Sequence, residues 1–253
     1  MQIQTEICCG SYADALAAMR GNASRIELNS ALPLGGLTPD IGDLLLCKER
    51  LSIPVIAMLR PRAGGFCYTE NEFLSMQKSA ETMLAAGADG LAFGILTPER
   101  MVDVSRTRLL VELIHSYGRT AVFHRAFDCL SDFAEGMERL IELGADRVLT
   151  SGGAATAPEG MEMIAYLQGK YGGQIELLAG CGVRSANVEV LICGTGISQV
   201  HSSCQGMQED YTAHGENVSF ALKEGADWAE YPCVGEETVR EFCMTIAKLE
   251  TNR

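Results

Sequence analysis

The sequence is poor in positive charge. Its 253 residues contain 33 Asp and Glu against 20 Lys and Arg, which gives a formal net charge of −13 at pH 7. No local cluster of basic residues reverses this balance. An acidic surface repels phosphate backbones and anionic headgroups, so we expect neither nucleic-acid binding nor binding to a membrane surface.

Long apolar runs are also absent. No stretch approaches the roughly 18 consecutive apolar residues of a membrane-spanning helix. The N-terminal segment MQIQTEICCG lacks the basic region and apolar run of a secretion signal, so we expect a cytoplasmic protein. Hydrophobic residues make up 47% of the chain, which is enough for a large core and excludes intrinsic disorder.

The ten cysteines include no Cys-x-x-Cys pair. This spacing removes support for a structural zinc site and for a thioredoxin-like redox motif. A domain of this size needs no covalent cross-links, and no secretion signal accompanies the cysteines, so we expect free thiols.

One pattern recurs along the chain: an amphipathic stretch ends at a glycine and leads through small and polar residues into a short apolar run. The copies are AAMRGNASRIELNS (17–30), MLAAGADGLAFGIL (83–96) and LIELGADRVLTSGG (140–153). Glycine suits the left-handed position that follows a helix. Each copy therefore predicts a helix, a turn and a strand, which is the pattern of βα units in a parallel sheet.

Eight short strand-like runs occur along the chain. They are Gln4–Ile7, Arg25–Leu28, Val55–Leu59, Gly90–Phe93, Thr120–Phe123, Arg147–Thr150, Glu176–Ala179 and Ser198–Val200. Helical patterns between them cover Glu70–Ala86, Asp103–Tyr117, Asp132–Leu143 and Pro158–Tyr171. Eight alternating units predict an α/β fold of the (β/α)₈ TIM-barrel type. An open dinucleotide-binding sheet would require a Gly-x-Gly-x-x-Gly turn after the first strand, which this chain lacks.

We expect one TIM-barrel domain over residues 1–253, because no linker or low-complexity segment divides the chain. Segment 205–234 is the least regular part and is expected to wrap the barrel. A C-terminal helix is expected over residues 235–250.

The C-terminal ends of barrel strands and the loops that follow them carry functional residues in TIM barrels. Side chains alternate along a strand, so Glu6 and Glu27 are expected to face the barrel interior. Two buried carboxylates need compensating cations, and Arg60, Arg62 and Arg125 are the expected partners.

The strand ends supply a predicted catalytic set and a predicted ligand-binding set. The candidate acid–base groups are Glu6, Glu27, His124, Asp128 and His201. The candidate ligand-binding residues, which would hold an anionic or polyhydroxylated compound, are Arg60, Arg62, Arg125, Ser151, Gly152, Gly180, Gly182, Ser202 and Ser203. A structural reading stays open, in which the charges form an ion-pair layer, the histidines are buried rim residues and the glycines form tight turns.

Three thiols could meet at one arc of the barrel rim. Cys181, Cys204 and Cys8 follow or end strands that are consecutive in a closed barrel. Thiolates favour Cu(I), so these residues are a candidate metal site. The alternative is that they are ordinary small buried residues, which is the usual role of a free cysteine.

Several blocks of the sequence resemble the CutC family of copper homeostasis proteins. The blocks are EICCGSYADALAA (6–18), RIELNSALPLGGLTP (25–39), IPVIAMLRPRAGGFCYTENEF (53–73), GADGLAFGILTPERMVDV (87–104), FHRAFD (123–128), GADRVLTSGGAATAPEG (144–160), GCGVRSANV (180–188) and VHSS (200–203). The resemblance implies a cytoplasmic, usually oligomeric TIM barrel linked to copper tolerance, with Cu(I) as its ligand. The family commonly has a cysteine where this chain has Asn29, which weakens any copper site that uses that position.

Two functional hypotheses follow. The first is a copper-binding homeostasis protein that uses the cysteines. The second is a lyase, isomerase or hydrolase that acts by Glu and His acid–base chemistry on a small anionic, phosphorylated or sugar-like substrate. The fold alone does not choose between them, because TIM barrels support many chemistries.

Overall fold

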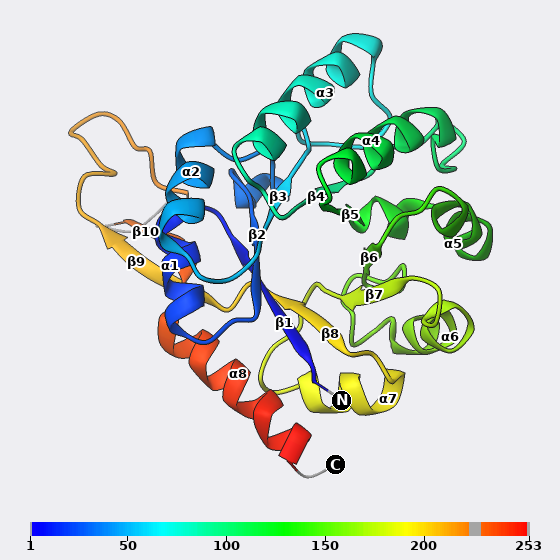
Figure 1. The fold of residues 1–253 in the computed structure, drawn as a ribbon. Coiled ribbons are helices and arrows are strands. Elements are labelled where there is room, and N and C mark those ends of the chain that lie inside the picture. The colour runs from blue at the N-terminus through cyan, green and yellow to red at the C-terminus, as the bar shows by residue number, and fades with distance from the viewer. Residues whose placement is uncertain (1, 223–228, 252–253) are drawn as a thin grey trace.

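The computed structural model describes residues 2–222 and 229–251. Eight parallel strands close into a barrel in the order β1 to β8, and helices surround the barrel (Figure 1). This topology confirms the predicted (β/α)₈ TIM barrel. Within the described residues, no helix is both long and apolar enough to cross a membrane.

The element bounds are close to those that the sequence predicts. The barrel strands are β1 Gln4–Cys9, β2 Arg25–Leu28, β3 Val55–Met58, β4 Gly90–Phe93, β5 Thr120–Phe123, β6 Arg147–Thr150, β7 Glu176–Ala179 and β8 Gln199–Ser202. The helices are α1 Tyr12–Arg20, α2 Ile41–Arg50, α3 Glu70–Ala85, α4 Val104–Ser116, α5 Phe133–Glu142, α6 Met161–Tyr171, α7 Val188–Thr195 and α8 Glu236–Thr251, with short 3₁₀ helices at Leu32–Leu34 and Arg125–Cys129.

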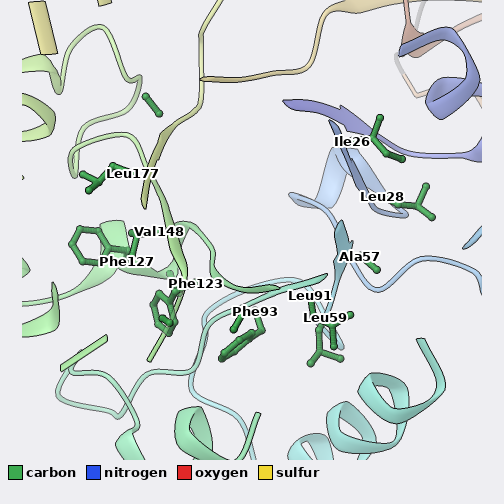
Figure 2. Packing of buried hydrophobic residues seen from close by; sticks show 14 of the residues in the cluster. Ile26, Leu28, Ala57, Leu59, Leu91, Phe93, Phe123, Phe127, Val148 and Leu177 are labelled. Atoms are coloured by element: carbon green, nitrogen blue, oxygen red, sulfur yellow. The ribbon is translucent and has the colours of Figure 1, made fainter. Parts of the chain in front are cut away.

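Strand alternation divides the core into two layers. Leu59, Leu91 and Phe93 are among the buried side chains that lie between the strands and the surrounding helices (Figure 2). The alternate positions of β3 to β5 point the other way, and there Ile56, Met58, Ala92 and Val122 form a small separate cluster inside the barrel. The interior beside β3, β4 and β5 is therefore apolar.

Local capping signals fix where helices begin. Thr69 accepts a hydrogen bond from the Glu72 N–H and the Glu72 side chain bonds back to the Thr69 N–H, so a capping box starts α3. Asp132 caps α5 through the N–H groups of Ala134 and Glu135.

The glycine of the repeated pattern has two different roles. Gly87 and Gly144 adopt positive φ after α3 and α5, as predicted. In the first copy the prediction is wrong, because Asn22 takes the positive φ and Gly21 does not. Gly21 instead allows α8 to pack closely, since a Cβ there would lie 2.5 Å from the Val239 Cβ.

The described parts of segment 205–234, residues 205–222 and 229–234, are more ordered than the sequence predicts, and residues 223–228 of this segment lie outside the described residues. The strands β9 Gln205–Asp210 and β10 Ala229–Val234 pair antiparallel and form a ribbon beside α1 (Figure 1). The Val234 N–H donates to the Asp14 carboxylate of α1 at 2.8 Å, which ties the ribbon to the barrel. The expectation of an irregular segment is therefore wrong for these two strands, whereas α8 lies where the last helix is predicted.

Candidate metal and ligand site at the barrel mouth

A cavity of about 860 Å³ opens at the C-terminal ends of the barrel strands. Polar side chains from the strand ends and apolar side chains from the loops share its wall. The residues that line it from the barrel include Cys8, Glu27, Asn29, Met58, Arg60, Phe66, His124, Arg125, Leu149 and His201. The β9–β10 ribbon closes one side of the cavity through Gln205, Met207, Glu230, Pro232, Cys233 and Val234.

Three potential metal ligands meet in this cavity. One donor atom each from Cys8, Glu27 and His201 lie within 4.8 Å of one another. The residues come from β1, β2 and β8, which are neighbouring strands, so the barrel itself brings them together. The thiol, carboxylate and imidazole form a compact group of mixed donors.

Buried neighbours orient two of these ligands. Glu6 Oε1 lies 2.8 Å from His201 Nδ1, which leaves the Nε2 atom of His201 for a ligand. The Asn29 amide donates to Glu27 Oε2 at 2.9 Å. A carboxylate behind a histidine ligand fixes its tautomer and raises its basicity, which is a common arrangement at metal sites.

The pKa values of the two buried carboxyl groups, Glu6 and Glu27, are shifted in opposite directions. Burial alone would raise the pKa of Glu6, but the charge of Arg25 and the hydrogen bond with His201 outweigh burial and hold that pKa far below its usual range. Burial raises the pKa of Glu27, and the attraction of His201 offsets this only in part. Glu6 is therefore firmly ionised, whereas Glu27 gives up its proton less readily.

The thiol and the imidazole of this group are shifted as well. Burial raises the pKa of the Cys8 thiol. Burial would lower the pKa of His201, but hydrogen bonds with Cys8 and Glu6 raise it well above its ordinary value. In the absence of a ligand the group therefore favours a thiol and an imidazolium.

The cations expected to neutralise Glu6 and Glu27 lie elsewhere. Glu6 pairs with Arg25, which also donates to Gln199 at 2.9 Å. These residues lie below the cavity, so Glu6 belongs to a structural ion-pair layer and does not line the cavity. The expected pairing with Arg60, Arg62 and Arg125 is wrong, because it was inferred from rim positions, whereas strand alternation places Arg25 beside Glu6.

The two arginines after β3 differ in position. Arg60 lines the cavity and donates to the backbone carbonyls of Leu34, Gly35, Gly36 and Gly64. Arg62 pairs with Glu72 on α3 and does not line the cavity.

The loop after β6, where Ser151 and Gly152 are expected to hold an anionic ligand, instead binds the protein's own Asp128. This carboxylate accepts hydrogen bonds from the Ser151 N–H at 3.0 Å, from the Thr150 hydroxyl at 2.5 Å and from the Gly153 N–H at 3.1 Å. Arg125 Nε also donates to it at 2.8 Å. Asp128 therefore has a structural environment and, like Ser151 and Gly152, does not line the cavity.

The loops after β7 and β8 contribute little to the cavity. The Ser202 hydroxyl donates to the Val183 carbonyl at 2.7 Å, and Gly180 packs against His201, with 3.2 Å between an added Cβ and the His201 Cβ. Gly182 adopts a positive φ in the turn. Of the candidates in these loops, Ser203 lines the cavity, whereas Gly180, Gly182 and Ser202 do not.

The three candidate thiols do not converge. Cys204 is buried in the apolar layer outside the barrel, and the Cys181 thiol donates to the Ala155 carbonyl at 3.2 Å. The structure brings Cys8 together with Glu27 and His201 instead. The prediction that the three thiols meet at one arc of the rim is wrong. Their strands are neighbours, but the thiols point in different directions.

His124 lies on the far side of the cavity from this group. The side chain is 3% exposed, its Nδ1 accepts a hydrogen bond from the Ala126 N–H at 3.1 Å, and its Nε2 has no partner among the described residues. Burial, reinforced by the charge of Arg60, lowers the pKa of His124 to about 3. The ring fits because residue 94 is glycine: a Cβ there would lie 2.6 Å from the imidazole.

The sequence analysis assigns no role to Phe66 or to the ribbon residues that line the cavity, and it mentions Asn29 only as the position where the resembling family commonly has a cysteine. Strand alternation places Asn29 in the barrel interior, which was a usable signal. Phe66 lies in an irregular loop and the ribbon has no clear apolar alternation, so neither carried such a signal.

Comparisons with known proteins decide the family. A model of the CutC family matches residues 3–206. The chain belongs to the CutC family. Among the relatives, a family protein CutC from Treponema denticola is 43% identical over 208 residues, 82% of this chain and 84% of its own. A family protein CutC from Vibrio vulnificus is 44% identical over 204 residues, 80% of this chain and 81% of its own.

A solved CutC structure from Streptococcus agalactiae is also similar to this chain. It has a TM-score of 0.75 and 29% identity and covers 80% of this chain and 99% of its own. That protein is described as a candidate copper homeostasis protein. The CutC match ends near the start of β9, so most of the ribbon and all of α8 lie outside the region that the family model covers.

Proposed function

We propose that this CutC protein takes part in copper homeostasis by binding one Cu(I) ion at the barrel mouth. The observation that carries the proposal is the convergence of Cys8, Glu27 and His201 within 4.8 Å in an accessible cavity. The description of the Streptococcus agalactiae relative points to copper as the metal.

The donor chemistry suits this metal. Cu(I) prefers soft ligands, and the Cys8 thiolate and the His201 imidazole provide one sulfur and one nitrogen donor. The Glu27 carboxylate is a harder ligand, and its negative charge beside the ion balances the positive charge that the ion brings. Metal binding would displace two protons, one from the Cys8 thiol and one from Nε2 of the His201 imidazolium, because the thiolate and the neutral imidazole are the ligand forms.

A catalytic role is the second candidate. The cavity of about 860 Å³ is far larger than one metal ion requires and is typical of a site for a small organic molecule. Glu27 lines this cavity and has a pKa raised by burial, which is a common property of a catalytic acid.

An anaerobic titration with Cu(I) against a competing chelator tests the copper proposal. The reduced wild type is expected to bind one equivalent, and Cys8→Ser is expected to weaken the affinity by at least about tenfold, or about 1.4 kcal/mol. The matched control is the double variant Cys181→Ser/Cys204→Ser, whose thiols are not part of the Cys8, Glu27 and His201 group and which should bind as the wild type does.

Two outcomes would contradict the proposal. Cu(I) affinity that is unchanged in Cys8→Ser would exclude that thiol as a ligand. The second outcome comes from a Zn²⁺ titration of the same proteins. If Zn²⁺ binds in a Cys8-dependent way and Cu(I) does not bind, the site binds a metal but that metal is not copper.

The assembly and location also stay predictions. We expect a homo-oligomer in the cytoplasm, as the family resemblance implies. Light scattering during gel filtration measures the oligomeric state, and a molecular mass equal to that of a single chain would contradict it.

A further inference from the structure

Arg60 is a buried cation without an anionic partner. The residue is 7% exposed, and within the part of the chain that the structure describes it forms no ion pair. Its terminal nitrogens donate to four backbone carbonyls, at distances from 2.7 to 3.2 Å, which fix the guanidinium in place. The nearby Tyr68 hydroxyl is neutral, because burial raises its pKa. The positive charge is held rigidly at the cavity wall and is not neutralised.

Phe66 contacts both this cation and a second unused donor, His124. The Arg60 guanidinium stacks over the Phe66 ring, 5.2 Å from its centre, and the Phe66 and His124 rings are 5.1 Å apart. His124 Nδ1 accepts from a backbone N–H, so the proton of the neutral ring is on Nε2. The Nε atom of Arg60 and the Nε2 atom of His124 are both buried polar atoms without a hydrogen-bond partner among the described residues.

We propose that the cavity binds a small organic monocarboxylate, whose carboxylate displaces the Phe66 ring at the cavity wall and so reaches Arg60 Nε–H and His124 Nε2–H, both of which are buried before the ligand binds. A buried cation and a buried N–H donor without partners are both unfavourable, and an anionic acceptor satisfies both. Because the guanidinium is already fixed, little side-chain entropy is lost when the anion binds.

The charge and the shape of the site favour a carboxylate over a phosphate. Arg60 contributes one unbalanced positive charge, whereas the other cavity arginine, Arg125, is paired with Asp128. The backbone N–H groups after β6 that could cradle a phosphate are bonded to Asp128. A single negative charge with two oxygens matches one cation and one neutral donor.

The other residues that line the cavity indicate the chemistry of the rest of the ligand. Leu32, Met58 and Leu149 line the cavity from the barrel side, and Met207 and Pro232 line it from the ribbon. A ligand that fills this space therefore carries an apolar body behind its carboxylate. Arg60 and His124 follow β3 and β5, whereas the proposed metal ligands lie on β8, β1 and β2, so the two sets of residues come from different strands around the same cavity.

The test compares carboxylates with their neutral amides. Metal-free wild-type protein is titrated by calorimetry with benzoate, 3-phenylpropanoate, 4-phenylbutanoate and octanoate, with the corresponding amides, and with inorganic phosphate. We expect at least one carboxylate to bind at least about tenfold more tightly than its amide and more tightly than phosphate. A series in which no carboxylate exceeds its amide overturns the proposal, and so does a preference for phosphate.

Variants locate the binding site. His124→Asn keeps an acceptor for the Ala126 N–H but removes the Nε2–H donor, so the affinity for the best carboxylate should fall at least about fivefold. Arg60→Gln should abolish the preference over the amide, but it removes four backbone contacts and needs circular dichroism to show that it folds. His115→Asn on the surface of α4 is the matched control and should bind as the wild type does. Equal affinities in His124→Asn and His115→Asn would overturn the assignment of this donor.

Discussion

The two sides of the barrel interior differ in chemistry. Beside β8, β1 and β2 the interior contains Glu6, Arg25, Glu27 and His201, all buried. Beside β3, β4 and β5 it contains the apolar cluster that includes Ile56 and Val122. Both sides have the same backbone geometry, so the inward-facing residue of each strand alone decides whether that side carries charge.

The polar side is itself divided by depth. The Glu6 carboxylate is fully paired and lies below the cavity, whereas Glu27 is nearer the mouth and lines it. The deep carboxylate stabilises the barrel and orients His201, and the upper one is available to a ligand. Burial of a charge is therefore not by itself evidence of function, because access to the cavity distinguishes the two groups.

The largest predicted effect is a difference in stability between variants of these two carboxylates. Glu6→Gln leaves Arg25 buried without its counter-ion, so the free energy of unfolding should fall by about 3–5 kcal/mol. Glu27→Gln keeps an oxygen for the Asn29 amide and removes no ion pair, so the loss should stay below about 1.5 kcal/mol. Urea denaturation at pH 7 measures both. Equal losses of unfolding free energy in the two variants would show that Glu6 does not stabilise the barrel more than Glu27 does.

The next prediction concerns the pH dependence that His124 imposes. Its pKa is about 3 in the folded protein and close to 6.5 in the unfolded chain, so between these values the unfolded chain binds more protons. This contribution makes the protein less stable as the pH falls below 6.5, by about 2 kcal/mol at pH 5, and has no effect above pH 7. In His124→Asn this part of the pH dependence should disappear. Parallel stability curves for the two proteins between pH 7 and pH 5 would contradict the assignment.

The smallest predicted effect uses Asn29, the position at which the family resemblance leads us to expect a cysteine. Asn29 Nδ2 lies 3.5 Å from the Cys8 sulfur, so Asn29→Cys places a second thiol beside the proposed copper ligand. We expect Cu(I) affinity to rise about tenfold, a gain of about 1.4 kcal/mol, in the same chelator competition. Asn29→Ser, which adds no soft donor, is the control. An equal change in the two variants would show that the added sulfur does not bind the metal.

The sequence predicts most of the barrel because each strand is short, apolar and bounded by turn residues. The repeat GADGLAF, for example, leads directly into β4. The β9–β10 ribbon was missed because QGMQED is polar and exposed along much of its length, so no apolar alternation marks it as a strand.

The candidate site was predicted less completely than the fold. Alternation placed Glu6, Glu27 and Cys8 in the interior, because that pattern depends only on local geometry. The partners of the charged residues depend on contacts between distant segments. Arg25, and not Arg60, neutralises Glu6, and the Asp128 carboxylate accepts the Ser151 N–H that was expected to bind a ligand. Such pairings are set by the closed barrel and cannot be deduced from positions along one chain.

The point at which the family match ends has a consequence for specificity. The shared region stops at residue 206, yet Met207, Glu230, Pro232 and Val234 beyond it line the cavity. The proposed metal ligands belong to the barrel that the family model covers, and part of the cavity wall belongs to a segment outside it. If the cavity binds an organic molecule as proposed, relatives that share the barrel but not the ribbon are expected to bind different molecules.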